Sequence, residues 1–189
     1  DVPLQVDANT AYTRDDIDHL CQLDQFDLLL IEQPLPEEDI LGHAELAKAS
    51  ATRVCLDESI VSIQTAVDAI ELGAAEIVNI KPGRVGGYLT ALRIHDLCVE
   101  RGIPVWCGGM VETGIGRAAN AGLASLPGFT LPGDISASNR YYTEDIAEPL
   151  FALNPDSTLS VPTAPGLGVT VNEKALDKFT ERKETFGHG

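Results

Sequence analysis

Four charged residues recur along the chain at an almost constant interval, each at the end of a short apolar run. They are Asp7, Glu32, Asp57 and Lys81, separated by 25, 25 and 24 residues. A polar residue at the same point of a repeated strand-then-helix unit indicates side chains gathered at one end of a barrel. Three carboxylates brought together raise one another's pKa unless a cation neutralises them. The pattern therefore favours a site for a hard divalent ion such as Mg²⁺, which prefers oxygen ligands.

Lys81 follows Ile80 at the end of a predicted strand. A partly buried ammonium near a divalent cation loses proton affinity, which would let it exchange protons with a carbon acid. The alternative is a surface lysine or a salt bridge to Asp57. Glu58 is expected to support the metal ligands, or else to be an ordinary acid at a helix start. Taken singly, each of the three acids could instead cap a helix or face solvent.

The apolar pattern predicts six strand-then-helix units that position these residues. Strands are expected at 2–9, 28–34, 53–59, 76–81, 104–108 and 129–132. Apolar residues at i, i+3 and i+4 predict helices from about 13, at 39–50, from about 63, at 89–101 and at 115–125. The continuous run Leu28 to Ile31 is typical of a strand buried on both faces, as in parallel sheets.

Six such units imply an α/β fold with a parallel sheet and helices outside it. A closed (β/α)₈ barrel needs eight units, so we expect an incomplete barrel that lacks its first strands. The alternative, an open doubly wound sheet, has no reason to place acids at the ends of consecutive strands. We expect one domain over 1–189, with 136–189 as an irregular tail containing a short strand (168–171) and a closing helix (173–184).

Composition narrows the classes of partner. The net charge is −16, from 13 basic and 29 acidic residues. This argues against a nucleic-acid or anionic-membrane partner, because binding phosphates requires a basic face. No run reaches the ~20 apolar residues of a membrane span, and the N-terminus lacks the basic start of a signal peptide, so we expect a cytoplasmic protein. The four cysteines form no CxxC pair and are expected to be buried thiols.

Several phrases of the sequence carry a resemblance to a known family. They are Val6-Asp7-Ala8-Asn9, Ile31-Glu32-Gln33-Pro34, Leu56-Asp57-Glu58-Ser59, Lys81-Pro82-Gly83-Arg84-Val85-Gly86-Gly87, Trp106-Cys107-Gly108-Gly109-Met110, Gly114-Ile115-Gly116-Arg117, Leu131-Pro132-Gly133-Asp134 and Pro165-Gly166-Leu167-Gly168-Val169. With these phrases the chain resembles the enolase superfamily, and within it the o-succinylbenzoate synthase / N-acylamino acid racemase group. The resemblance covers nearly the whole chain, as the C-terminal barrel portion of such a protein.

The resemblance implies a Mg²⁺ ion held by Asp7, Glu32 and Asp57, with Mn²⁺ or another divalent ion as the alternative. The ion stabilises an enediolate formed when a proton is removed next to a carboxylate. Lys81 matches the family lysine that stabilises the intermediate in the synthase and acts as an acid/base in the racemase. The synthase dehydrates a ring precursor of menaquinone to o-succinylbenzoate, and the racemase moves the α-proton of an N-acylamino acid between faces.

The resemblance further implies a small-molecule carboxylate substrate, which we expect Asn9, Gly109 and Met110 to contact. A homo-oligomer is expected for the full-length form. Our leading interpretation is the synthase, a Mg-dependent lyase, with the racemase as first alternative. A non-catalytic remnant or split-barrel subunit is a different class of alternative. Muconate-cycloisomerase-like and dipeptide-epimerase-like branches share the metal ligands but not the 108–110 and 131–134 phrases together.

The chain departs from the family pattern at its start. The partner lysine of the family belongs to a Lys-x-Lys motif on the second barrel strand, and both this motif and the N-terminal capping domain are missing from the 189 residues. We therefore expect the purified 189-residue chain to be inactive, or nearly so, because it lacks the base that opens the dehydration. An assay of o-succinylbenzoate formation without any added N-terminal fragment tests this. Clear product formation would contradict it.

Overall fold

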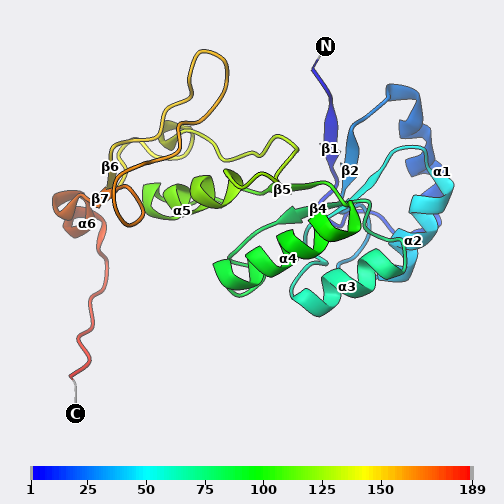
Figure 1. Cartoon of the computed structure of the whole chain (residues 1–189), viewed down its shortest axis with the longest axis horizontal. Helices are drawn as coiled ribbons and strands as arrows, with labels where there is room; N and C mark the ends of the chain where they lie inside the picture. The colour runs from blue at the N-terminus through cyan, green and yellow to red at the C-terminus, as the bar shows by residue number, and fades with distance from the viewer. Residues whose placement is uncertain (1, 188–189) are drawn as a thin grey trace. The chain divides into compact units, whose positions relative to one another are not determined.

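The computed structural model describes residues 2–187 of the chain (Figure 1). The chain divides into two compact units, Asp1–Gly108 with Leu126–Gly133, and Gly109–Ser125 with Asp134–Gly189. Residues 1, 188 and 189 of the predicted domain lie outside the described residues, and the single domain over 1–189 stays a prediction. No helix within the described part of the chain is long and apolar enough to cross a membrane.

Five parallel strands form the sheet of the first unit, in the order β1-β2-β3-β4-β5. They are β1 (Gln5–Asp7), β2 (Leu30–Glu32), β3 (Val54–Leu56), β4 (Ile77–Ile80) and β5 (Val105–Cys107). The order follows the chain without the reversal that a doubly wound sheet requires. Together with the curl of the sheet, this confirms an α/β fold built as part of a barrel.

The sixth expected strand, at 129–132, is present only as a parallel bridge between Val105 and Phe129. The Leu131 N–H also donates to the Val105 carbonyl oxygen at 3.3 Å. The count of six β/α units is therefore not confirmed.

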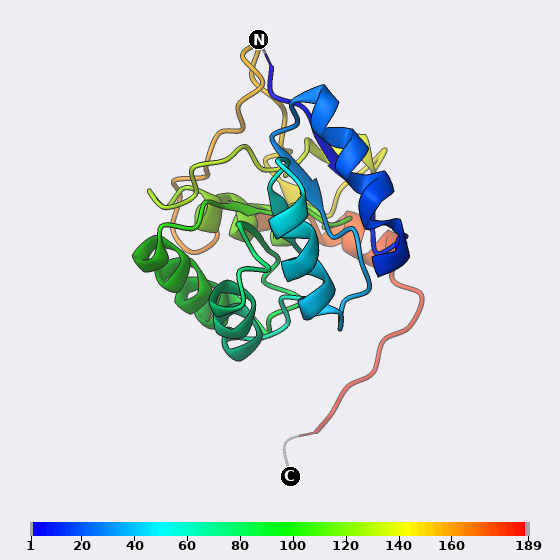
Figure 2. The same cartoon turned by 90° about the vertical axis from the view of Figure 1, so that its right-hand side faces the viewer.

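Helices connect the strands of the first unit and follow one another round the outside of its sheet (Figure 2). They are α1 (Ile17–Leu20), α2 (Ile40–Ala49), α3 (Ile63–Glu71) and α4 (Tyr88–Arg101). Ser62 caps α3 by accepting from the Thr65 N–H at 3.1 Å, and Gly102 ends α4 at a left-handed φ of 68°. The helix expected from residue 13 is split, with 3₁₀ turns at Arg14–Asp16 and Cys21–Phe26 flanking the short α1.

Buried side chains from consecutive strands make the core beneath the site. Leu30, Cys55, Ile77 and Trp106 form one cluster, against which Leu29 and Leu131 pack. The Trp106 indole N–H donates to the Cys55 sulfur at 3.4 Å, so the ring's polar atom is satisfied inside the core. No disulfide joins the described cysteines, three of which are buried.

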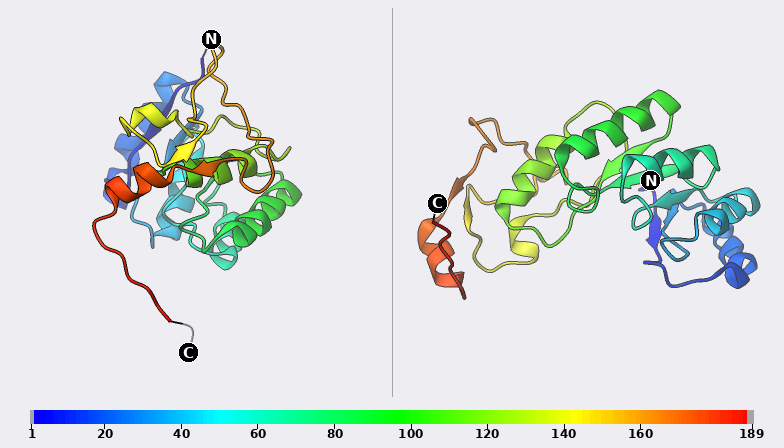
Figure 3. Two further views of the ribbon diagram at one scale, coloured as in Figure 1. Left: turned by 90° about the vertical axis from the view of Figure 1, so that its left-hand side faces the viewer. Right: turned by 90° about the horizontal axis from the view of Figure 1, so that it is seen from below.

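The second unit is built around α5 (Gly114–Ala124). Besides α5 it contains the antiparallel pair β6 (Ala147–Glu148) and β7 (Thr170–Val171), the 3₁₀ turn Ser138–Arg140, and α6 (Glu173–Phe179). In Figure 3, α6 is the orange-red helix that follows β7. Ala118 and Ala121 of α5 pack against Phe151, which gives this unit a small core of its own.

Asp24 ties the first helical segment to the turn before β3. Its carboxylate accepts hydrogen bonds from the Ser50 hydroxyl, the Ala51 N–H and both the N–H and hydroxyl of Thr52, all between 2.7 and 2.9 Å. The Ala51 bond and its neighbours lower the pKa of Asp24 from 3.8 to about 2. Ionised Asp24 therefore stabilises the fold above pH 3.8, and this contribution is lost as the pH falls towards 2.

We expect Asp24→Asn to lower the free energy of unfolding at neutral pH and to flatten its decline in acid. The flattening follows because the variant has no carboxyl to protonate at this position. Urea unfolding between pH 2 and pH 6 measures both effects. Asp27→Asn is the matched control, since Asp27 is exposed in the same segment and asparagine tolerates its left-handed φ of 50°. An acid slope unchanged by Asp24→Asn would contradict the assignment.

Candidate functional site

Asp7 and Glu32 face each other across the first strand pair. They are register partners at the ends of β1 and β2, and neighbouring strands lie only about 4.8 Å apart. Asp7 is exposed, and its carboxylate accepts the Asn9 N–H at 2.9 Å. Glu32 is 3% exposed. The parallel register thus places one accessible and one buried carboxylate side by side.

The Glu32 carboxyl has lost much of its acidity. Burial, together with the negative charges of Asp7 and Asp57, raises the pKa of Glu32 to about 8, although a hydrogen bond from Asn79 opposes the rise. The Asn79 Nδ2 donates to Glu32 Oε1 at 2.7 Å. The Asn79 Oδ1 is buried without a hydrogen-bond partner among the described residues. The position of Glu32 thus calls for a proton or a cation.

Asp57 follows β3 and is 1% exposed. Its Oδ2 lies 2.6 Å from the Lys81 Nζ, and its Oδ1 forms an ion pair with Arg84. Burial by itself would lower the pKa of Lys81, but the hydrogen bond and charge of Asp57 outweigh it and leave that pKa raised. The sequence had suggested a lowered value beside a divalent ion. The salt bridge to Asp57, which the sequence left as an alternative, is what the structure shows.

Two neighbours shape the space around Lys81. A Cβ atom at Gly108 would lie 2.6 Å from the Lys81 Cε and 2.3 Å from the Asn79 Oδ1, so these side chains require a glycine there. Glu58 is partly buried, and burial followed by the charge of Asp57 raises its pKa. Its Oε2 has no hydrogen-bond partner within residues 2–187. Glu58 is therefore a further carboxyl at this site whose ionised form is disfavoured.

The donor set can be compared with the needs of a metal ion. Within the described part of the chain, no three His, Cys, Asp or Glu side chains form a group that could hold a metal ion. In this structure Lys81 and Arg84 supply the positive charge beside Asp57. The chemistry of Asp7, Glu32 and Asp57 nevertheless fits a hard cation. They offer oxygen ligands, and burial together with the charges of Asp7 and Asp57 raises the pKa of Glu32.

The expected substrate contacts are divided between the two units. Asn9 follows β1 in the first unit, is exposed and adopts a left-handed φ of 45°. Gly109 and Met110 belong to the second unit. The Gly109 N–H donates to the Asp134 carboxylate, and the Met110 N–H donates to Glu112 at 2.7 Å. The Met110 residue is 53% exposed. All three substrate contacts stay predictions.

The sequence did not predict a role at this site for three of its residues, Gln33, Asn79 and Arg84. Asn79 carried a signal, because it is a polar residue inside the apolar run of β4. Gln33 carried a weaker one, since it is a polar residue directly after Glu32 at the end of an apolar run. Arg84 lies in the phrase Lys81 to Gly87 that carries the family resemblance, but as a loop arginine it carried no signal of a charge pair with Asp57.

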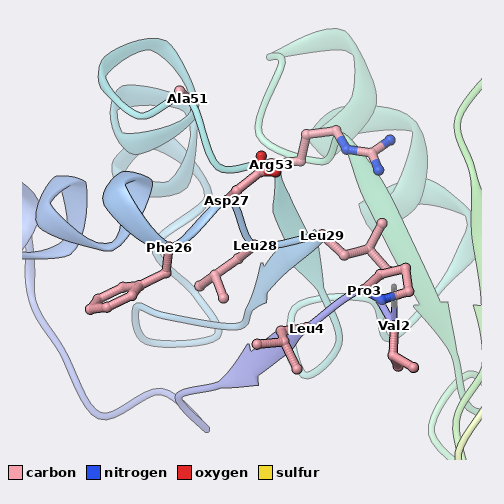
Figure 4. Close-up of a pocket in the computed structure, with 9 residues that line it drawn as sticks. All are labelled: Val2, Pro3, Leu4, Phe26, Asp27, Leu28, Leu29, Ala51 and Arg53. Atoms are coloured by element: carbon pink, nitrogen blue, oxygen red, sulfur yellow. The ribbon is translucent and has the colours of Figure 1, made fainter.

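The pocket in Figure 4 lies away from these residues. Its lining comes from Val2, Pro3, Leu4, Phe26, Asp27, Leu28, Leu29, Ala51 and Arg53. These residues precede β1, β2 and β3, whereas the candidate site lies at the carboxyl ends of the same strands. Enzymes built on such barrels keep their chemistry at the carboxyl ends of the strands. The pocket therefore belongs to the opposite end of the sheet.

Comparisons with known proteins agree with this geometry. The family model of enolase C-terminal domain-like proteins matches residues 1–175. An N-succinylamino acid racemase of Amycolatopsis is 65% identical over 187 residues, covering 99% of this chain and 50% of the relative. An o-succinylbenzoate synthase of Bacillus subtilis (strain 168) is 52% identical over 185 residues, covering 98% and 50%.

Solved structures give the same result. A member of the enolase superfamily from Listeria innocua superposes with a TM-score of 0.91 at 48% identity, covering 95% of this chain and 48% of that one. The chain spans about half the length of the curated relatives that it matches. The comparisons thus concern the half of each relative that corresponds to these 189 residues.

Arg84 offers a test of the charge balance around Asp57. We expect Arg84→Met to lower the free energy of unfolding in EDTA by about 3 kcal/mol, because it removes one partner of a buried charge. Arg101→Met is the matched control, since the Arg101–Glu71 pair is longer, at 3.7 Å, and exposed. We expect Arg101→Met to lower the free energy of unfolding by only about 0.5 kcal/mol. Urea unfolding measures both, and equal losses would contradict the role given to Arg84.

Proposed function

The chain belongs to the enolase C-terminal domain-like family, and from this premise we propose that the intact protein is a metal-dependent enzyme that removes a proton next to a carboxylate. The reaction proposed is that of an o-succinylbenzoate synthase, a lyase of menaquinone biosynthesis. The observation that carries the proposal is the gathering of Asp7, Glu32, Asp57 and Lys81 at the carboxyl ends of successive parallel strands. This is the place where barrel enzymes build their active sites.

Asp7, Glu32 and Asp57 would hold the metal ion, with Mg²⁺ as the proposed species and Mn²⁺ as the alternative. When bound, the ion supplies positive charge where negative charge develops on the substrate carboxylate. Glu32 supports this assignment because its buried carboxyl resists ionisation without a cation nearby. Asn79 fixes one oxygen of Glu32 through its 2.7 Å hydrogen bond. The other carboxylate oxygen of Glu32 would be available to the ion.

Lys81 is the proposed catalytic residue. In the synthase reaction its ammonium would stabilise negative charge on the reacting substrate, and in a racemase reaction it would exchange the α-proton. Its raised pKa keeps it charged beside Asp57, which suits the stabilising role. Gly108 leaves the space that the Lys81 side chain occupies. Asn9, Gly109 and Met110 are proposed to contact the substrate.

Racemisation of N-succinylamino acids is the second candidate function. The specific observation in its favour is the 65% identity to a relative named N-succinylamino acid racemase. Both reactions begin with removal of a proton next to a carboxylate, so one set of residues can serve both. A cytoplasmic location and a homo-oligomer of the intact protein remain part of this proposal.

The test is to assay the intact protein with Mg²⁺ on both substrates. We expect o-succinylbenzoate formation that EDTA abolishes and added Mg²⁺ restores. Racemisation of an N-succinylamino acid without o-succinylbenzoate formation would favour the second candidate. Failure on both substrates, with the protein folded and Mg²⁺ present, would support a non-catalytic remnant or a split-barrel subunit instead.

Two carboxylate variants test the metal assignment in the same protein. We expect Asp57→Asn to weaken Mg²⁺ binding more than about 100-fold, because residues that merely support a ligand already cost 10- to 100-fold. Asp24→Asn is the control, since Asp24 binds the turn at residues 50–52 and not the site. Isothermal titration measures both affinities. Equal effects of the two substitutions would count against Asp57 as a ligand.

A further inference from the structure

We propose that Gln33 is a positioning residue that holds Asp57 at a fixed distance from Glu32, an inference that rests on the proposed metal-dependent function. Gln33 follows Glu32 directly in the chain and is completely buried. Its side chain accepts a hydrogen bond from the backbone N–H of Asp57, the residue directly after the neighbouring strand β3. Gln33 therefore links two residues proposed to bind the same ion, through the chain to Glu32 and through a hydrogen bond to Asp57.

The Gln33 side chain continues the hydrogen bonding of the sheet beyond the last strand pair. The register of β2 and β3 ends with Glu32 opposite Cys55, and the Gln33 N–H donates to the Cys55 carbonyl oxygen at 2.9 Å. Beyond this point the Gln33 Oε1 accepts the Asp57 N–H at 2.9 Å and the Ser59 N–H at 3.2 Å. The side chain thus takes the place of a backbone carbonyl in fixing the Asp57 backbone.

The other end of the amide is also fully engaged. Its Nε2 donates to the Ser59 hydroxyl oxygen at 2.8 Å and to the Leu35 carbonyl oxygen at 3.2 Å. Ser59 in turn donates to the Glu37 carbonyl oxygen at 2.7 Å. Because the network is buried, removal of the amide would leave several polar groups without partners. Its hydrogen bonds define one orientation of Gln33.

The backbone of Gln33 points to a role beyond ordinary packing. Its φ is 37°, in the left-handed region that side chains other than glycine rarely adopt, and Pro34 follows it. Such conformations persist where surrounding contacts over-determine them, and they cluster at functional sites. Here the N–H groups and acceptors bound by the amide, among them the His43 Nε2 at 3.4 Å from the Gln33 Nε2, supply those contacts. The turn directs the chain away from the sheet immediately after Glu32.

The experiment uses the intact protein and Mn²⁺ as the probe. Gln33→Met removes the amide at similar volume, whereas Gln33→Glu keeps an acceptor for the Asp57 N–H. We expect Gln33→Met to weaken Mn²⁺ binding about 10- to 100-fold, measured by electron paramagnetic resonance, and Gln33→Glu to weaken it less. Hydrogen exchange in EDTA should show faster exchange at the Asp57 and Ser59 amides of the methionine variant.

Asn120→Leu is the matched control. Asn120 is also buried and donates to a glutamate, Glu112, at 2.9 Å, but it belongs to α5 in the second unit. The Asn120→Leu substitution should lower the midpoint of thermal unfolding in EDTA without changing the Mn²⁺ affinity. If Gln33→Met likewise lowers the midpoint and leaves the affinity unchanged, Gln33 has only a structural role and the inference is overturned.

Two further outcomes separate this inference from the proposed function. If the wild-type protein binds no Mn²⁺, the proposed function fails. The positioning role of Gln33 is then tested by hydrogen exchange at the Asp57 amide. Faster exchange in Gln33→Met supports this role, and unchanged exchange overturns it. If Gln33→Met does not fold, Ser59→Ala removes one partner of the amide and keeps the rest. Faster Asp57 exchange in that variant supports the inference, and unchanged exchange contradicts it.

Discussion

Burial of carboxylates at the ends of β2 and β3 is the constraint on which the rest of the site depends. Glu32 and Asp57 are almost completely enclosed, and a buried carboxylate is unfavourable unless positive charge or hydrogen bonds compensate it. The structure provides Lys81 and Arg84 for Asp57 and Asn79 for Glu32. These partners come from β4 and the loop after it, so one strand and its loop compensate the carboxylates of both preceding strands.

The parallel sheet turns a periodic sequence into a local cluster. Because consecutive strands pair in sequence order, residues about one repeat apart become neighbours across the sheet. Beyond the last backbone pair, side chains take over the pairing, as the hydrogen bonds of Gln33 to Asp57 and Ser59 show. The strands therefore set where each side chain of the site begins. The buried polar groups then fix its orientation, because only one arrangement satisfies their hydrogen bonds.

Much of the fold was predictable from the sequence because local patterns determine it. Apolar runs marked all five strands of the sheet, and helical spacing marked α2 to α5. The sixth strand was expected and is present only as a bridge at Phe129, because a strand requires a continued run of pairing with its neighbour, which an apolar run in the sequence does not guarantee. The first helix was expected as one segment, but 3₁₀ turns lie on both sides of α1. The spacing of apolar residues does not distinguish α-helix from 3₁₀-helix, because the two conformations are similar.

The sequence by itself determined which residues carry charge at the strand ends and that they recur with the period of a β/α unit. Tertiary structure decided which charge is buried and what compensates it. Lys81 and Arg84 pair with Asp57, and Asn79 donates to Glu32 across 47 residues of chain. The physical reason is that pKa values, ion pairs and hydrogen bonds depend on distance and burial in three dimensions, whereas sequence spacing fixes only the strand and the position from which each side chain starts.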